Sequence, residues 1–427
     1  MSNVPNVPKR RFPEFREAGE WETKELRKVA AIIKKKAGSD KFRLMSITAG
    51  VGLVSQLEKF GREIAGAQYK NYLVIERHDF AYNKSATKEY PEGFIAMYAG
   101  NEPGAVPNSI FTCFRVDASA VFPQYLDYLF ISNLHGRWLK MFITVGARAH
   151  GSLNIDDNDL LALPVPFPQG DHSLREQQKI ADCLASLDEL ITLEAQQLDT
   201  LKTHKKGLMQ QLFPAEGETL PKLRFPEFRD AGEWEEKSLG DIARITSGGT
   251  PSRAKPDFWG GSIPWITTSL IGFNIIDHAE EFITAEGLVN SSAKLFPAQT
   301  LLMAMYGQGK TRGKVALLGM EATTNQACAA IMLNEEVDTN FAFQNLASRY
   351  DEIRKLSNEG GQENLSAGLI KEIPLTHPSI PEQQKIADCL ASLDDLITAQ
   401  AQQLAALKTH KKGLMQQLFP VMDGVSA

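Results

Sequence analysis

The chain has 427 residues, of which 43% are apolar and 23% are charged, and its formal net charge is −6. This composition is typical of a soluble globular protein with two or three domains, and it disfavours a nonspecific coat for nucleic acid. No apolar run approaches the length of a membrane span, and the basic N-terminus lacks the apolar stretch of a signal peptide. We therefore expect a cytoplasmic protein.

Two segments of the chain occur twice. PKRRFPEFREAGEWETKEL at Pro8–Leu26 returns as PKLRFPEFRDAGEWEEKSL at Pro221–Leu239, with 15 of 19 positions identical. Glu176–Pro214 returns at Glu382–Pro420, with 34 of 39 positions identical. We call these copied segments the frame, and the two unlike stretches that they enclose the inserts. Because the frame is constant and the inserts differ, the pattern suggests a protein that holds two domains at a set distance, each of which recognises something different.

The first insert, Arg27–Arg175, reads as a small α+β domain. Short strands are expected within Tyr72–Phe80, Phe94–Ala99 and Ser109–Val116, followed by a helix over Tyr125–Phe142. Its densest basic stretch consists of Lys34, Lys35, Lys36, Lys41 and Arg43. This stretch is either a solvated face or, beside Gly38 and Ser39, a contact with a phosphate backbone.

The copied segment after each insert predicts a long helix. Apolar residues recur at alternating steps of four and three, which is a heptad seam. In the first copy these are Ile180, Leu184, Leu187, Ile191, Leu198, Leu201, Leu208 and Leu212, and in the second they are Ile386, Leu390, Leu393, Ile397, Leu404, Leu407, Leu414 and Leu418. Lys205 and Lys411 interrupt the seam and either fix its register or extend to solvent. Each helix should be about 57 Å long at ~1.5 Å per residue.

The second insert, Gly240–Pro381, also reads as a small α+β domain. Strands are expected within the four apolar stretches SIPWIT, TLLMAMY, GKVALLG and ACAAIML, followed by an amphipathic helix over Phe341–Ser357 and a final strand over Ile370–Pro378. Neither insert is strongly basic, since the first has 18 basic and 14 acidic residues and the second has 11 and 15.

Polar and basic residues around glycines make the loops of the second insert candidate DNA contacts. Glycine permits close backbone approach, hydroxyls and lysines bind phosphate, arginine pairs with guanine, and side-chain amides pair with adenine. The candidates are Ser247, Gly249, Thr250, Arg253, Lys255, Gln308, Lys310, Arg312, Lys314, Asn325, Gln326 and Gln362. Each could instead belong to a solvated turn or satisfy local backbone. The copied aromatics Phe12, Phe15, Trp21, Phe225, Phe228 and Trp234 are expected to pack the arms onto the frame or onto a partner.

An antiparallel pair is the simplest way for the two long helices to bury their seams. We therefore predict two mixed α/β domains at opposite ends of an antiparallel helix pair, related by a pseudo-two-fold axis. The expected boundaries are 1–175 for the first domain with its arm, 176–214 for the first helix, 215–381 for the second domain with its arm, 382–420 for the second helix and 421–427 for the tail. A helix pair that recruits another coiled-coil protein is the alternative.

These features together resemble the specificity subunits of type I restriction-modification enzymes, over essentially the full length. The resemblance rests on the doubled plan, on the E-Q-x-K-I-A-x-x-L-x-x-L-D opening of each helix, and on ITSGGTPSRAKPDFWGGSIPWITTSLI in the second insert. The first insert lacks that last motif. DFAYNK at Asp79–Lys84 and GARAHGSLNIDDNDLLALPVPFP at Gly146–Pro168 resemble other recognition-domain variants, and they add Lys84, Arg148 and His150 to the candidate contacts.

The resemblance implies a non-catalytic subunit that selects a bipartite DNA target, one half per recognition domain. It implies double-stranded DNA, two adenine-methylating modification subunits and restriction subunits as partners, with no membrane. S-adenosylmethionine, ATP and Mg would be used by those partners, and this chain would hold no cofactor or metal. Unlike inserts imply an asymmetric target, and same-face reading favours about 10 bp between half-site centres.

Two other classes of function compete with DNA recognition. A scaffold would use the helices to bridge partners without nucleic acid, and it would show no salt-dependent DNA binding. An enzyme would need preorganised carboxylates, but the adjacent pairs Asp156–Asp157 and Glu280–Glu281 do not form an acid/base dyad. The chain also lacks the N-P-P-[FYW] motif of adenine methyltransferases and the G-x-x-x-x-G-K-[ST] phosphate loop.

Overall fold

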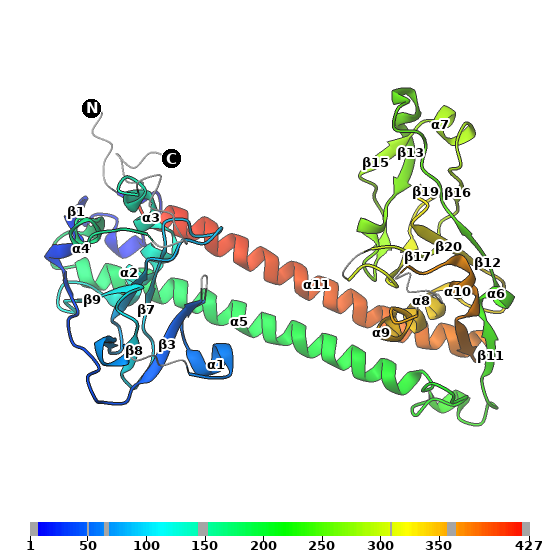
Figure 1. Ribbon diagram of the computed structural model, residues 1–427, viewed down its shortest axis with the longest axis horizontal. Coiled ribbons are helices and arrows are strands. Elements are labelled where there is room, and N and C mark those ends of the chain that lie inside the picture. The colour runs from blue at the N-terminus through cyan, green and yellow to red at the C-terminus, as the bar shows by residue number, and fades with distance from the viewer. Residues whose placement is uncertain are drawn as a thin grey trace. The chain divides into compact units, whose positions relative to one another are not determined.

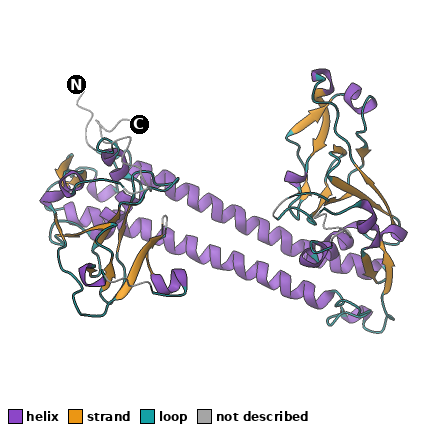
Figure 2. Cartoon of the chain, in the orientation of Figure 1, coloured by secondary structure: helices purple, strands orange, loops and turns teal. Residues whose placement is uncertain are grey.

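The computed structural model describes residues 7–48, 51–63, 68–143, 153–307, 310–356 and 364–420. The chain forms two compact units, the first made of Met1–Glu194 with Gln403–Ala427 and the second of Ala195–Gln402. Each unit contains one insert, one arm and part of both long helices, which Figure 1 shows in green and in orange to red. Figure 2 shows that strands and short helices make up the inserts.

The first unit contains two four-stranded sheets and one strand pair. One sheet has the order β2 (Ala30–Ile32), β9 (Phe111–Val116), β6 (Phe80–Asn83) and β7 (Phe94–Met97), and the other has the order β4 (Gly52–Ser55), β3 (Arg43–Thr48), β8 (Gly104–Val106) and β5 (Leu73–Ile75). The arm strand β1 (Trp21–Glu25) pairs antiparallel with β10 (Pro164–Pro168). The helices are α1 (Gln56–Phe60), α2 (Pro123–Ile131), α3 (Leu134–Leu139), α4 (Asp157–Leu161) and the first long helix, α5 (Ser173–Leu212).

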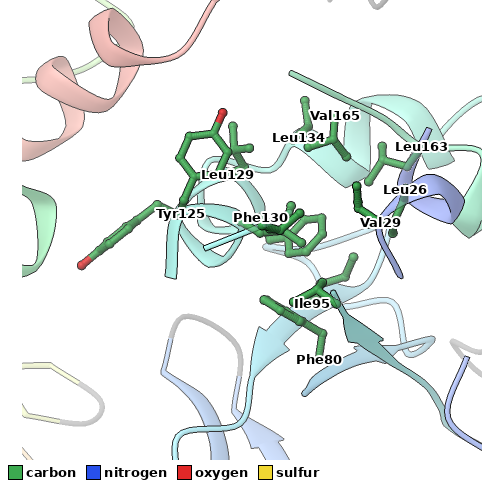
Figure 3. Close-up of a cluster of buried hydrophobic side chains, with 14 of the residues drawn as sticks. Leu26, Val29, Phe80, Ile95, Tyr125, Leu129, Phe130, Leu134, Leu163 and Val165 are labelled. Atoms are coloured by element: carbon green, nitrogen blue, oxygen red, sulfur yellow. The ribbon is translucent and has the colours of Figure 1, made fainter. Parts of the chain in front are cut away.

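The main core of the first unit lies between the β2–β9–β6–β7 sheet and α2. Phe80 and Phe114 stack with ring centroids 5.2 Å apart, and Phe130 of α2 meets Phe80 edge-on at 5.5 Å. Figure 3 shows Phe130 among Leu26, Val29 and Ile95, so the arm and the sheet share one cluster with α2. Aromatic side chains bury large apolar areas, and they hold this small sheet onto its helix.

The second unit contains a five-stranded and a four-stranded sheet. The first has the order β12 (Ala243–Ser247), β20 (Cys328–Leu333), β17 (Leu301–Ala304), β18 (Val315–Leu318) and β14 (Ile275–Ile276), and the second has the order β15 (Glu281–Ile283), β13 (Trp259–Ile266), β19 (Ala322–Thr324) and β16 (Leu295–Phe296). The arm strand β11 (Glu235–Ser238) pairs with β21 (Pro374–His377). The helices are α6 (Leu239–Ile242), α7 (Ala285–Val289), α8 (Thr339–Ser348), α9 (Tyr350–Ile353), α10 (Ala367–Glu372) and the second long helix, α11 (Ile380–Leu418).

The fully buried strands of the five-stranded sheet separate two apolar clusters. Leu301, Met303, Val315 and Leu317 face a cluster that includes Phe341 of α8, while their neighbours Leu302 and Ala316 face the opposite cluster. This alternation is the period-two pattern of a strand with both faces covered. Asp338 caps α8 by accepting a hydrogen bond from the Phe341 amide at 2.9 Å.

The long helices pair antiparallel within each unit. In the first unit, Lys411 late in α11 contacts Asp188 early in α5, with Nζ 2.5 Å from Oδ1. In the second unit, Lys205 late in α5 contacts Asp394 early in α11 at 2.6 Å. The expected seam residues are all buried or half-buried, so the heptad prediction is confirmed. The two lysines form ion pairs between the helices and do not extend to solvent.

Three local predictions needed correction. The helix expected over Tyr125–Phe142 is broken into α2 and α3, because Asn133 adopts φ 63°, a left-handed conformation that interrupts a helix. The helix expected over Phe341–Ser357 is likewise divided at Arg349 between α8 and α9. The final strand begins only at Pro374, since Ile370–Glu372 ends α10, whose amide of Leu369 is capped by Ser366.

Candidate nucleic-acid interface

The copied frame residues make the same contacts in both units. Arg11 forms a bidentate pair with buried Glu176, with Nε–Oε1 at 2.6 Å and Nη2–Oε2 at 2.7 Å. Arg224 repeats both distances with buried Glu382. Each arm is thereby fixed to the first turns of a long helix, because a planar guanidinium matches a carboxylate through two parallel hydrogen bonds.

The aromatic residues of the arms pack onto the frame and the inserts. Trp21 lies 6.2 Å from Tyr125, which also contacts Phe419 at the end of α11. In the second unit, Phe341 occupies the corresponding position between Trp234 and Phe213 at the end of α5. Of the two expected roles for these aromatics, packing onto the frame is therefore the one that the contacts of Trp21 and Trp234 support.

The topology of the five-stranded sheet brings most of the second insert's candidates to one end. Ser247 ends β12, and its partner strand β20 begins next to Ala329 at that end. The β17–β18 connection, which carries Lys310, Arg312 and Lys314, lies at the same end, since Met303 pairs with Val315. Asn325 and Gln326 precede β20. We call this end of the sheet the loop face.

The glycine-rich loop after β12 is closely packed. Gly249 is buried, its amide donates to the Thr324 carbonyl at 2.8 Å, and a Cβ on it would lie 2.3 Å from Ser292. The indole of Trp265 donates to the Gly249 carbonyl at 3.0 Å. Glycine is therefore required here by protein packing. The hydroxyl of Thr250 donates to the side-chain oxygen of Gln326, and Ser247 is half-buried.

Arg253 is held by its own domain. Its guanidinium lies over the ring of Trp259 at 3.7 Å and pairs with Glu281, where Nη2 is 3.0 Å from Oε1. This pairing lowers the pKa of Glu281 from its ordinary value. Lys255 is exposed and lies 4.7 Å from the ring centroid of Phe258. A DNA contact by Arg253 would have to share or break the pair with Glu281.

The basic loop between β17 and β18 is only partly engaged. Arg312 donates from Nη2 to the carbonyl of Arg354 at 2.9 Å, whereas the Lys310 side chain is exposed and its carbonyl accepts from the Tyr350 hydroxyl at 2.6 Å. Lys314 lies 5.8 Å from the ring of Phe273. Within the described residues, Lys310 and Lys314 form no ion pair with a carboxylate.

Asn325 and Gln326, the two amide candidates that the structure describes, differ in the exposure of their side chains. Asn325 Oδ1 accepts from the amide of Ala327 at 3.0 Å, which is the local backbone role that the sequence left open. Gln326 is exposed, with one contact to Thr250. Gln308 and Gln362 lie outside the described residues.

In the first unit the basic stretch is exposed. Lys34, Lys35 and Lys36 follow β2, and Lys35 contacts Glu76 at 3.4 Å. Lys41 and Arg43 are also exposed at the start of β3. Sequence reasoning missed Lys70, whose carbonyl accepts from the amide of Gly38 at 3.0 Å. Lys70 is far from this stretch along the chain, so its position beside Gly38 had no local signal.

Lys84 has acidic surroundings. It lines a hollow of about 580 Å³ together with Asp156, Asp157 and Asp159. A polyanion would meet these carboxylates as well as the lysine, so the local charge disfavours a phosphate there. Arg148 and His150 lie outside the described residues.

Sequence reasoning also missed Lys294, which reaches the loop after β12. Its Nζ lies 2.6 Å from the Thr246 hydroxyl and 3.1 Å from the Ser247 carbonyl. Lys294 is isolated in sequence and carries no motif. Only the fold brings it to the glycine-rich loop.

The described residues contain neither a metal-binding cluster nor a membrane-spanning helix. Across residues 7–420, apart from the gaps stated above, no cluster of three His, Cys, Asp or Glu side chains is arranged to hold a metal ion. Burial raises the pKa of Cys328 to about 12 and that of Cys113 further, which makes both thiols unreactive. Among the same residues, no helix has the length and apolar character needed to cross a bilayer.

Comparisons with known proteins agree with the repeated architecture. Residues 231–409 match the family model described as type I restriction modification DNA specificity domain. The chain is 30% identical to the specificity subunit of the type I restriction enzyme EcoR124I/EcoR124II from Escherichia coli, over 55% of this chain and 56% of that protein. It thus spans about half the length of that relative. It is 24% identical to a putative type I restriction enzyme MjaX specificity subunit from Methanocaldococcus jannaschii, over 94% of this chain and 93% of that one.

A solved structure shows the same fold. The S subunit of a type I restriction-modification system from M. genitalium aligns with a TM-score of 0.59 at 15% identity, covering 97% of this chain and 100% of that one. With the family model on the second half and a relative over nearly the whole chain, the two inserts and two long helices have a common explanation. Residues 231–409 therefore match a type I restriction modification DNA specificity domain, and the chain as a whole is similar to the specificity subunits of type I restriction enzymes.

Proposed function

We propose that this chain is the non-catalytic DNA-recognition subunit of a type I restriction-modification complex and that it reads a bipartite, asymmetric target. The observation that carries the proposal is the repetition of the arm and helix contacts around two unlike inserts. Constant contacts give both inserts an equivalent mounting, whereas their different loops suit two different half-sites. Base contacts specify sequence and phosphate contacts position the protein, so each insert should supply both kinds.

The proposed phosphate contacts are candidate lysines that form no ion pair among the described residues. These are the exposed Lys34, Lys36 and Lys41 in the first insert and, in the second, the exposed Lys255 and Lys310 and the half-buried Lys314. Gln326 is the proposed base-edge contact, because it is exposed at the loop face. Lys310→Ala should weaken binding to every DNA sequence to a similar extent. Gln326→Ala should instead reduce the base specificity at one position of the target. The reverse pattern would show that the two roles were misassigned.

Exchange of one insert tests the proposed division of labour. The chain would be expressed with its cognate modification subunit in an unmethylated host, and N6-methyladenine would be mapped across the genome. Replacement of residues 27–175 by a foreign recognition insert should change one half of the motif only. A change in both halves would contradict the modular arrangement, and no motif at all with the native chain would favour a scaffold.

Helix length tests the proposed role of the frame as a ruler. Insertion of two heptads at matched positions in α5 and α11 keeps the seam in register. The spacer of the methylated motif should lengthen while both halves stay the same. A spacer that does not change would remove the ruler role.

We also propose that the frame carries two equivalent docking sites for modification subunits. A hollow of about 570 Å³ in the second unit is lined by Met209, Phe213 and Lys222, and one of about 670 Å³ in the first unit is lined by their copies, Met415, Phe419 and Lys9. Hollows that share these copied frame residues suit two copies of one partner. Recruitment of restriction subunits would follow from the assembled complex.

Filling the hollows one at a time tests this docking. Gln210 and Gln416 line the two hollows and are exposed. Gln210→Trp or Gln416→Trp alone should halve the amount of modification subunit that co-purifies, and the double substitution should abolish it. Gln197→Trp, at an exposed position of α5 outside both hollows, is the control. Unchanged stoichiometry in the double variant would place the docking site elsewhere.

A further inference from the structure

An exposed aromatic residue, Phe273, stands at the loop face in an unusual backbone conformation. Its φ is 62°, a left-handed value that is rare for bulky residues, and its side chain is 37% exposed. The backbone around it is fixed, because its amide donates to the Val315 carbonyl at 2.9 Å and the Asn274 carbonyl accepts from Leu317 at 3.0 Å. Backbone strain that neighbouring hydrogen bonds maintain is found most often at functional positions.

Phe273 lies at the same end of the five-stranded sheet as the basic loop. It immediately precedes the β14 region, which runs parallel to β18 with Ile275 opposite Leu317. The start of β14 and the start of β18 therefore share one end of the sheet. This topology places Phe273 beside Lys310 and Lys314, which precede β18.

Aromatic and cationic side chains surround Phe273. Tyr350 meets it edge-on at 5.2 Å, and Lys314 lies 5.8 Å from its ring centroid. Tyr350 in turn carries Arg354 over its ring at 6.0 Å and donates its hydroxyl to the Lys310 carbonyl at 2.6 Å. We call Phe273, Tyr350, Lys310, Lys314 and Arg354 the aromatic-basic platform.

The charge of the platform is positive among the described residues. Lys310 and Lys314 have no carboxylate partner there. Glu352, on the same short helix as Tyr350, is directed to Arg349 with Oε2 3.0 Å from Nε. An exposed ring flanked by cations is the combination that proteins use to stack on the bases of single-stranded nucleic acid, and in duplex DNA such a ring can insert between base steps while the cations neutralise adjacent phosphates.

We infer that Phe273 inserts at a base step of the duplex DNA target and partly unstacks it, with Lys310 and Lys314 on the flanking phosphates. This inference rests on the proposed function and adds an aromatic contact to it. Phe273 contributes affinity at the half-site of the second insert without adding a charge contact. Its effect on binding should therefore be independent of salt, unlike that of the lysines.

The test measures affinity as a function of salt for the full chain assembled with its modification subunits. The duplex carries the motif found by methylation mapping. Phe273→Ala should weaken binding roughly tenfold or more, as removal of a stacking aromatic does, with the slope of log K against log salt unchanged. Phe273→Trp should retain affinity. Lys314→Ala should instead reduce the slope by about 0.9, the value for one phosphate contact.

Phe282 provides the matched control. It is 38% exposed on β15 of the other sheet, so Phe282→Ala removes a similar exposed ring away from the platform and should leave affinity unchanged. As a readout that does not depend on a variant, 2-aminopurine is placed at each position of the second half-site and its flanks. Wild-type binding should change its fluorescence at one step, and Phe273→Ala should abolish that change.

Two DNA-binding results would overturn the inference. One is Phe273→Ala binding within twofold of wild type, and the other is no fluorescence change with the wild-type complex at any position. Because both are measured on a duplex that the wild-type complex methylates, neither is confused with failure of the proposed function, in which no motif would be found. Weaker co-purification of modification subunits with Phe273→Ala and unchanged DNA affinity would identify the platform as a protein contact and would likewise overturn it.

Discussion

The first and second units attach their inserts to the frame through different insert residues. Asp188 accepts a hydrogen bond from the Tyr128 hydroxyl at 2.8 Å, and its copy Asp394 accepts one from the Gln344 amide at the same distance. Three residues earlier on each insert helix, Tyr125 and Phe341 fill equivalent places between an arm tryptophan and a helix-end phenylalanine. The frame therefore requires a donor and an aromatic ring, and it tolerates different residues that supply them.

The units also differ in their titratable groups. In the first unit Asp127 is half-buried and His135 is buried, whereas Phe343 stands in the second unit at the position that corresponds to Asp127. Burial disfavours the charged form of each group. The first unit should therefore respond to pH in ways that the second does not.

The largest expected effect concerns the arm anchors, where the units should behave alike. Arg11→Ala leaves Glu176 as a buried unpaired carboxylate, and Arg224→Ala does the same to Glu382. Loss of one partner of a buried pair costs about 3–5 kcal/mol. Denaturant unfolding of the full chain would measure both losses, and Arg16→Ala, on an exposed arm position, is the control. Clearly unequal losses of unfolding free energy in the two variants would contradict the equivalence of the two arm anchors.

Acid should destabilise the first unit through His135. Burial lowers its pKa from 6.5 to about 4, so in the folded state its neutral form is favoured. As the pH falls from 6.5 towards 4, the unfolded chain takes up a proton that the folded chain does not, and stability decreases by up to about 3 kcal/mol. The free energy of unfolding at pH 7 and pH 4.5 would be compared between wild type and His135→Gln. Identical pH dependence of the two proteins would rule out this role.

Asp127 should have the opposite effect to His135, because it lowers the stability of the first unit as the pH rises. Burial raises its pKa from 3.8 to about 6, so its folded charged form is disfavoured and stability is lost as the pH rises through 3.8 to 6. Asp127→Asn keeps the oxygen that accepts from the Met97 amide and removes the charge. Its free energy of unfolding should exceed that of the wild type by on the order of 1–3 kcal/mol at pH 7 and by little at pH 4. Asp199→Asn, on an exposed part of α5, should change nothing, and a destabilised Asp127→Asn would contradict the argument.

The smallest expected difference lies in the seam lysines. Lys411→Met and Lys205→Met each remove a half-buried ion pair, which should cost about 1 kcal/mol because both aspartates retain access to water. The loss should be larger for Lys411, since it also lies over the ring of Tyr128 at 5.1 Å and attracts Asp127. Thermal unfolding of the two variants side by side measures this difference. A larger loss for Lys205 would contradict the proposed asymmetry.

Local sequence signals predicted most of the elements but few of the contacts. The heptad period predicted α5 and α11, and short apolar stretches predicted β5, β7, β9, β13, β17, β18 and β20, whereas β6 begins only where the strand expected within Tyr72–Phe80 ends. The break at Asn133 was missed because asparagine adopts left-handed conformations only in particular contexts. The loop face was anticipated in part, as basic and amide residues near glycines, but Lys294 and Phe273 carry no such signal.

The sequence by itself determined the doubled frame, the long helices and the mixed character of both inserts. These depend on repetition and on periods of 2 and 3.5 residues, which are local along the chain. Only the tertiary structure decided which charges are available. Arg253 is paired with Glu281, 28 residues away, and Lys84 shares a hollow with Asp156, Asp157 and Asp159, while Lys310 and Phe273 remain exposed at the loop face. A side chain's charge, solvation and partners are set by groups distant in sequence, and the fold is what brings those groups together.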